Sequence, residues 1–160
     1  MQRVITEAKR QGVALAFGTL PPPQRGAFFA DANQIVISDR LDPIQAAESG
    51  AHELGHCYFG DRCSTRASEE RAWIFAAKIL IKLEPYMQAE LEDPHPVAIA
   101  NHLRTTRRMV ELYQQHHLHA QALAAPRNIF GQYEDEDYFD DGALMHSLRS
   151  GREFRCGLIA

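Results

Sequence analysis

Two histidines and a glutamate near residue 50 have the types and spacing of a catalytic metal site. His52 and His56 are the ends of the segment HELGH, inside a stretch with helical periodicity. Residues four apart share one face of a helix, so both imidazoles can reach one metal ion. Glu53 follows the first histidine and projects beside such a metal, where it can take a proton from bound water. The pattern predicts a zinc site, one ion per chain, with Glu53 as catalytic base.

A zinc site with two histidines needs a third protein ligand and one open position. Glu69 and Glu70 are the candidates, because they start a second helical segment shortly after His56. Glu69 shares a helix face with Ala72 and Ala76, and small side chains let two helices approach closely. Glu70 falls on a different face, and acids are common in the first turn of any helix. We expect Glu69 to be the third ligand.

The residues around the motif resemble the ImmA/IrrE metallopeptidases. The resemblance rests on AHELGH, on the pattern E-x-x-A-x-x-F-A that begins at Glu69, and on the apolar strand IVIS before the motif. It covers roughly residues 13 to 85. The chain departs from the family at Trp73, where Asn is usual, and at residues 81–85, where Met-Pro is usual. Neither departure touches an expected ligand.

This resemblance implies a zinc peptidase whose ligands correspond to His52, His56 and Glu69, with Glu53 as the base. Members of the family commonly cleave a helix-turn-helix repressor encoded nearby, and so switch on mobile-element, DNA-damage or anti-phage defence genes. We therefore expect an endopeptidase that cuts a partner protein at one or few sites. The rival hypothesis is a regulatory DNA- or protein-binding module that keeps a structural zinc and performs no hydrolysis.

An α+β fold is predicted around these residues. A helix is expected over residues 1–11 and a strand over 13–17, and two apolar runs around residues 31–33 predict a β-hairpin. These strands would form a small N-terminal antiparallel sheet packed on a zincin-type helical core. The motif helix is expected from Pro43 to Phe59, with Asp42 as its N-cap and Gly60 as its stop.

Further helices are expected over residues 68–82 and from Pro94 or Pro96 toward His119, with Asp93 as cap and a break near Thr105. We expect two regions: a zincin-like metallopeptidase core over residues 1–92 and a mainly helical C-terminal region over 93–160. The second region includes a tail and an acidic segment over residues 134–141, of which six are Asp or Glu.

Three arginines in the expected C-terminal region are candidate nucleic-acid contacts. The segment that contains Arg104, Arg107 and Arg108 resembles a short helix-turn-helix often seen after this peptidase core. The arginines could then contact phosphates, with DNA as an activating ligand. The alternative, which we favour, is a pair of core-packing helices with solvated arginines.

Cys156 is a candidate inhibitory ligand. A thiolate binds zinc well, so this residue could fill the open coordination position, although a cysteine without such a role is the simpler interpretation. The chain has three cysteines in all, which fits reduced thiols better than a disulfide framework. An oxyanion-stabilising donor is also needed, and the sequence does not choose among Tyr86, Tyr113, His95 and His146.

Composition excludes some classes of protein. The 160 residues carry a formal net charge of −4, so no global attraction to nucleic acid is expected. No apolar stretch is long enough to cross a membrane, and the polar N-terminal segment lacks the apolar core of a secretory signal. We expect a cytoplasmic protein without a membrane partner.

Overall fold

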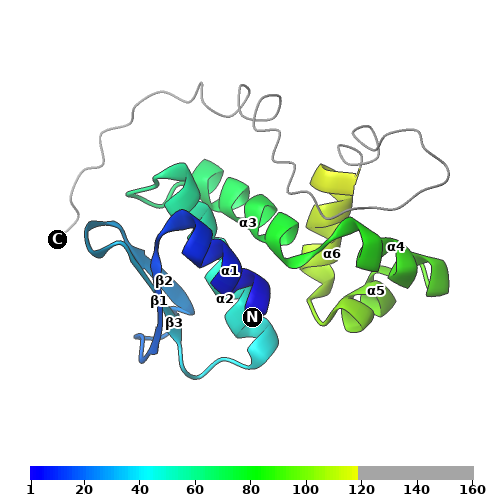
Figure 1. The fold of residues 1–160 in the computed structure, drawn as a ribbon, viewed down its shortest axis with the longest axis horizontal. Helices are drawn as coiled ribbons and strands as arrows, with labels where there is room; N and C mark the ends of the chain where they lie inside the picture. Colours follow the sequence, from blue (N-terminus) through cyan, green and yellow to red (C-terminus); the bar gives the residue numbers. More distant parts are fainter. Residues whose placement is uncertain (119–160) are drawn as a thin grey trace. The chain divides into compact units, whose positions relative to one another are not determined.

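The computed structural model describes residues 1–118, which form a small sheet and a set of helices (Figure 1). The α+β class is confirmed. In chain order the elements are α1 (Gln2–Gln11), β1 (Ala14–Gly18), β2 (Gly26–Phe29), the 3-10 turn η1 (Ala30–Ala32), β3 (Gln34–Ser38), α2 (Pro43–Phe59), α3 (Arg66–Leu80), α4 (Leu83–Glu92), α5 (Pro96–Leu103), α6 (Arg107–Tyr113) and the short π-helical turn η2 (Gln114–Leu118).

The sheet is mixed, which corrects the expected antiparallel sheet. Its strand order is β1-β3-β2, with β3 antiparallel to β2 and parallel to β1. The expected hairpin forms between β2 and β3. Ile35 and Ile37 make β3 the most deeply buried strand, with both side chains 0% exposed, and it takes the centre. The second strand of the hairpin, β3, therefore pairs with β1 and runs parallel to it, whereas the first strand, β2, lies at the edge.

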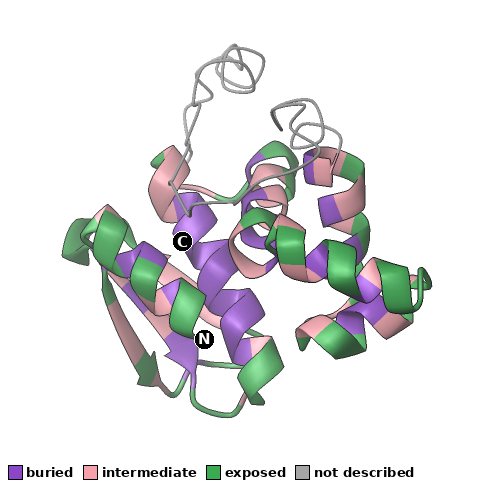
Figure 2. Ribbon diagram, turned by 45° about the vertical axis from the view of Figure 1, so that its right-hand side comes forward, coloured by how far each residue is buried: buried purple, intermediate pink, exposed green. Residues whose placement is uncertain are grey.

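The motif helix α2 has the bounds that its end signals predict. The Asp42 carboxylate accepts from the backbone N–H groups of Ile44 and Gln45 at 2.9 Å, and Gly60 ends the helix in the left-handed conformation at φ 66°. Most of α2 is buried (Figure 2). A Cβ on Gly50 would lie 2.8 Å from side chains of both Val4 and Ile37, so α1, α2 and β3 meet at this point.

Helix α3 packs against α2 at the smallest residues of both helices. A Cβ on Gly55 would lie 2.8 Å from the Ala72 Cα, and Ala72 and Ala76 are both 0% exposed. The close approach expected from the alanine face is confirmed. The helix starts slightly earlier than expected, because Thr65 caps it through a reciprocal pair of hydrogen bonds with Ser68.

The C-terminal helices differ from expectation in two details. Helix α4 was not predicted, because Pro85 suggests a helix end, whereas here it lies in the first turn of a new helix, where proline is tolerated. The cap of α5 is His95, whose side chain accepts from Val97 N–H, and Asp93 instead accepts from His95 N–H. The expected break near Thr105 is confirmed, since α5 ends at Leu103 and the next residue, Arg104, adopts the left-handed conformation at φ 54°.

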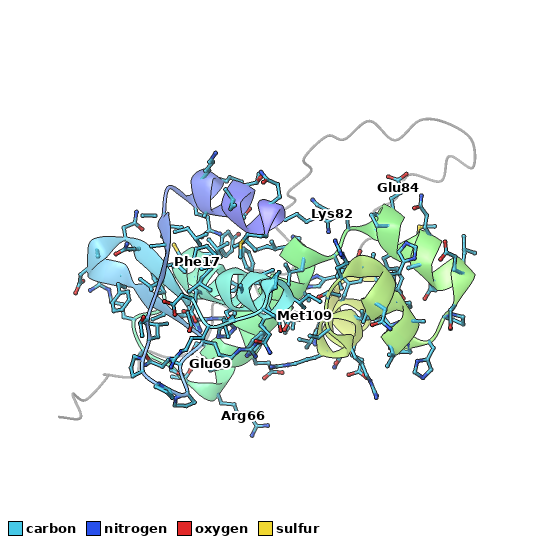
Figure 3. All side chains as sticks on the ribbon, turned by 90° about the horizontal axis from the view of Figure 1, so that it is seen from below. Phe17, Arg66, Glu69, Lys82, Glu84 and Met109 are labelled. Atoms are coloured by element: carbon cyan, nitrogen blue, oxygen red, sulfur yellow. The ribbon has the colours of Figure 1, made fainter. Side chains whose placement is uncertain are left out.

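The buried residues of the C-terminal helices join the same apolar cluster as those of the sheet and α2. Ile99 of α5 and Met109 of α6 (labelled in Figure 3) belong to this cluster together with Ile35 and Leu54. The division at residues 92 and 93 stays a prediction, and the acidic segment lies outside the described residues. None of the helices within residues 1–118 has the length and apolar character of a membrane-spanning segment.

Candidate metal centre

Three side chains from α2 and α3 converge on one point. The Nε2 atoms of His52 and His56 are 3.1 Å apart. The Glu69 carboxylate lies 3.1 Å from His52 Nε2 through one oxygen and 3.4 Å from His56 Nε2 through the other. Glu69 is in the first turn of α3, the end of that helix beside α2 (Figure 3). The structure thus brings together the three residues that were expected to bind metal.

The separations between these ligand atoms fit a zinc ion. Zn–N bonds of about 2.0–2.1 Å in a tetrahedral site place neighbouring ligand atoms roughly 3.3 Å apart. The three separations here are 3.1, 3.1 and 3.4 Å. Burial, followed by the adjacent His56, lowers the pKa of His52, which keeps its imidazole neutral and able to coordinate. Glu70, the alternative third ligand, is exposed and is not part of this group.

Glu53 lies beside the three candidate ligands and is held against strand β2. Its side chain accepts from the backbone N–H of Phe28, and a Cβ on Gly26 would lie only 2.9 Å from the Glu53 Cγ. Burial, followed by the charge of Glu69, raises the pKa of Glu53 to about 7, against the opposing effects of His56 and the Phe28 hydrogen bond. A carboxylate with a pKa in this range suits proton transfer at neutral pH.

A buried carboxylate that the sequence interpretation missed contacts the outer nitrogen of His56. Asp61 Oδ2 lies 3.0 Å from His56 Nδ1, and the Asp61 side chain is 6% exposed. Its other oxygen contacts a guanidinium nitrogen of Arg71. The sequence does contain a signal for this contact, because Asp61 directly follows Gly60, the glycine that ends the motif helix. A helix stop at Gly60 turns the chain back over the last turn, where His56 lies.

The other two ligands have different surroundings. Ser64 Oγ donates to Glu69 Oε1 at 2.7 Å, which orients the carboxylate from the loop before α3. His52 stacks on the Trp73 ring, with ring centroids 4.0 Å apart, and the Arg108 guanidinium lies 3.9 Å from the centre of the same indole. The Nδ1 atom of His52 is buried and has no hydrogen-bond partner among the described residues.

The candidate ligands His52, His56 and Glu69, called the ligand group below, open into a cavity of about 810 Å³. One wall is β2 with the η1 turn, and the other is the end of α2 with the loop that follows it. Strand β2 is an edge strand of the sheet, because the order is β1-β3-β2. His52, Glu53, His56 and Glu69 all line this cavity. An extended peptide could therefore lie along β2 and pass over the ligand group.

The remaining predicted residues lie elsewhere. Tyr86 and Tyr113 are fully buried against one another in the C-terminal helices, and neither these tyrosines nor His95 line the cavity. Cys156 and His146 lie outside the described residues. No oxyanion donor is therefore supplied by the three candidates that the structure describes.

The three arginines have different environments. Arg104 is exposed at the end of α5, and Arg107 pairs with Glu111 at 2.6 Å. Arg108 is exposed, as expected for a solvated arginine, and its guanidinium also contacts Trp73, the residue that stacks on His52. A contact between these arginines and DNA stays a prediction.

Residues 8–113 match the family model described as the IrrE N-terminal-like domain, Peptidase_M78. The chain belongs to this family. The family match supports a metallopeptidase-type function, and it extends beyond the motif helices to include α4, α5 and all of α6. A comparison with curated proteins gave no match.

Proposed function

We propose that the protein is a zinc-dependent endopeptidase that cleaves a partner protein. The observation that carries the proposal is the convergence of His52, His56 and Glu69 beside a buried Glu53 in a cavity bounded by an edge strand. Membership of the IrrE-like family supports the same class of reaction. Arginine-mediated binding to a nucleic acid would need none of these buried groups.

The residues divide the chemistry between them. His52, His56 and Glu69 would hold the zinc ion, which when bound polarises the scissile carbonyl and acidifies a water molecule. Glu53 takes the proton of the attacking water on its carboxylate and passes it to the nitrogen of the leaving amine. The Phe28 N–H holds Glu53 in place from the strand side, and the carboxylate lines the cavity into which the ligand group opens.

Strand β2 orients the substrate in this proposal. It contributes four residues of backbone with one edge unpaired among the described strands. An extended segment can add to such an edge through main-chain hydrogen bonds, with its alternate side chains in the cavity. Only a loop or linker of a folded partner can become extended in this way. The proposed substrate is therefore a protein with an accessible linker, and family resemblance favours a helix-turn-helix repressor encoded nearby.

The proposal is tested with the purified chain, zinc and the repressor encoded by the adjacent gene. We expect the wild type to cut at one or few sites, identified by mass spectrometry. Glu53→Gln should keep its zinc, measured by elemental analysis, and lose cleavage by about 100-fold or more, the usual effect of removing a general base. Glu70→Gln is the matched control, because Glu70 is exposed and outside the ligand group.

A zinc-loaded Glu53→Gln variant that cuts at the wild-type rate would overturn the proposed mechanism. Zinc binding without cleavage of any protein or peptide by the wild type would favour the rival hypothesis of a structural zinc in a regulatory module.

A further inference from the structure

We propose that Asp61 and Arg71 are a positioning pair that fixes the proton of His56 on Nδ1 and so presents its Nε2 to the metal. This inference rests on the proposed metal site. It assigns a role to two residues that lie outside the ligand group. Neither residue touches the substrate in this account, and both act through His56.

The contact between Asp61 and His56 has a defined direction. The carboxylate of Asp61 can only accept, so the 3.0 Å contact requires a proton on His56 Nδ1. A neutral imidazole with its proton on Nδ1 has its free lone pair on Nε2, the atom that faces His52 and Glu69. The contact thus selects the tautomer that can bind metal and holds the ring in the binding orientation.

The end of α2 brings Asp61 to this position. Gly60 adopts the left-handed conformation, and the backbone N–H of Asp61 then donates to the His56 carbonyl at 2.9 Å. The same two residues are therefore joined through both backbone and side chain. This double link leaves the carboxylate little freedom, because the helix-ending turn already fixes its backbone.

Arg71 holds the other side of the carboxylate. Its guanidinium contacts Asp61 Oδ1 and lies 4.9 Å from the centre of the Phe59 ring. Arg71 is on α3, the helix that also supplies Glu69. The pair consequently ties the last turn of α2 to α3, and it satisfies the charge that Asp61 buries near the ligands.

A purely structural role for the pair predicts a different outcome. If Asp61 and Arg71 only connect two helices, their loss lowers stability and leaves the zinc affinity of the folded protein unchanged. If they position His56, zinc affinity falls even where the protein remains folded. Metal binding therefore distinguishes the two roles, and it does so without any assay of cleavage.

The experiment measures zinc affinity by competition with a chromophoric chelator, for the full chain and its variants. Asp61→Asn, which keeps the shape and removes the charge, should weaken zinc binding about 10- to 100-fold. The Co²⁺-substituted variant should also show a shifted visible absorption spectrum, because the ligand field at the metal changes. Asp61→Glu should recover part of the affinity, and Arg71→Met should weaken it less than Asp61→Asn does.

Asp31→Asn is the control, because Asp31 lines the same cavity, is exposed and has the same charge. Circular dichroism and thermal melts identify variants that are folded. If Asp61→Asn does not fold, the zinc affinities of Asp61→Glu and Arg71→Lys are measured instead, because both variants keep the charges and shift their positions. The positioning role predicts that both bind zinc more weakly than the wild type. Wild-type zinc affinity and an unchanged Co²⁺ spectrum in the folded variants would overturn the positioning role. A wild type that binds no zinc would instead overturn the proposed function.

Discussion

The two histidines of the candidate metal centre are held in different ways. On the His56 side, the outer ring nitrogen contacts a buried carboxylate that is itself held by Arg71. On the His52 side, the ring stacks on Trp73, and its outer nitrogen has no partner among the described residues. Hydrogen bonding orients one ligand, and aromatic packing orients the other.

This difference shows that one ligand group can combine a directional constraint with a non-directional one. A hydrogen bond to Nδ1 fixes both the tautomer and the angle of the ring. A stacked indole fixes the plane of the ring but leaves the tautomer unspecified. The Glu69 carboxylate contacts both histidines, so it joins the two sides. Changes to the two sides should therefore have unequal effects on metal binding.

The largest effect is expected where the two sides meet. Glu69→Ala removes the candidate ligand that contacts both histidines. Zinc affinity should therefore fall by more than roughly 100-fold, the upper limit for residues outside the ligand set. Glu70→Ala should bind zinc like the wild type, because its side chain is exposed. Titration against a chelator measures both. Equal losses in the two variants would mean that the third ligand is misassigned.

A second test forces apart α2 and α3, the helices that supply the candidate ligands. Gly55→Ala places a methyl group 2.8 Å from the Ala72 Cα, which is backbone and cannot rotate away. We expect a loss of about 1–3 kcal/mol in the free energy of unfolding, despite the better helix propensity of Ala. Zinc binding should weaken as well, because α2 and α3 move apart.

Urea denaturation of the Gly55→Ala variant is compared with that of Gly18→Ala, where the new methyl group meets only a Val36 side-chain carbon at 3.3 Å. A smaller loss at Gly55 than at Gly18 would contradict the tight α2–α3 contact.

On the His52 side, a moderate effect is expected from removal of the stack. Trp73→Ala should weaken zinc binding by an amount equivalent to about 0.5–1.5 kcal/mol, the usual contribution of an aromatic pair. Trp73→Phe keeps an aromatic face and should lose less. The loss should be smaller than that of Asp61→Asn, because the stack does not set the tautomer. A larger loss of zinc affinity in Trp73→Ala than in Asp61→Asn would contradict this difference between the two histidines.

The smallest effect is expected at the outer end of the His52 side. Arg108→Gln removes the cation over the Trp73 ring. A cation–π contact of this kind stabilises an exposed site by about 0.5–1 kcal/mol. Zinc affinity should rise slightly, since a positive charge near His52 opposes binding of a cation. Arg107→Gln, which loses only an exposed ion pair with Glu111, is the neighbouring control. A fall in zinc affinity for Arg108→Gln alone would give Arg108 a supporting role that this account does not include.

The parts of this molecule that were predictable from sequence are those with local causes. Helix α2 begins and ends where predicted because Asp42 and Gly60 act on their own neighbours. Glu69 was predictable because a three- and four-residue spacing places it on the alanine face of α3. These signals need no knowledge of the rest of the fold.

The parts that were missed depend on distant contacts or on ambiguous residues. The order of the strands was missed because periodicity identifies a strand but not its neighbours. Helix α4 was missed because Pro85 can end one helix or begin another. The stack of Arg108 on Trp73 joins residues far apart in the chain, and no local pattern indicates it. Asp61 had a local signal, the glycine before it, whose consequence for His56 was overlooked.

The most direct test of the metal centre is anomalous diffraction at the zinc edge from crystals of the zinc-loaded protein. We expect one peak in this part of the chain, within bonding distance of His52 Nε2, His56 Nε2 and the Glu69 carboxylate, with Glu53 beside it and not bonded to it. A peak bound by other residues, or no peak at these three side chains, would contradict the account.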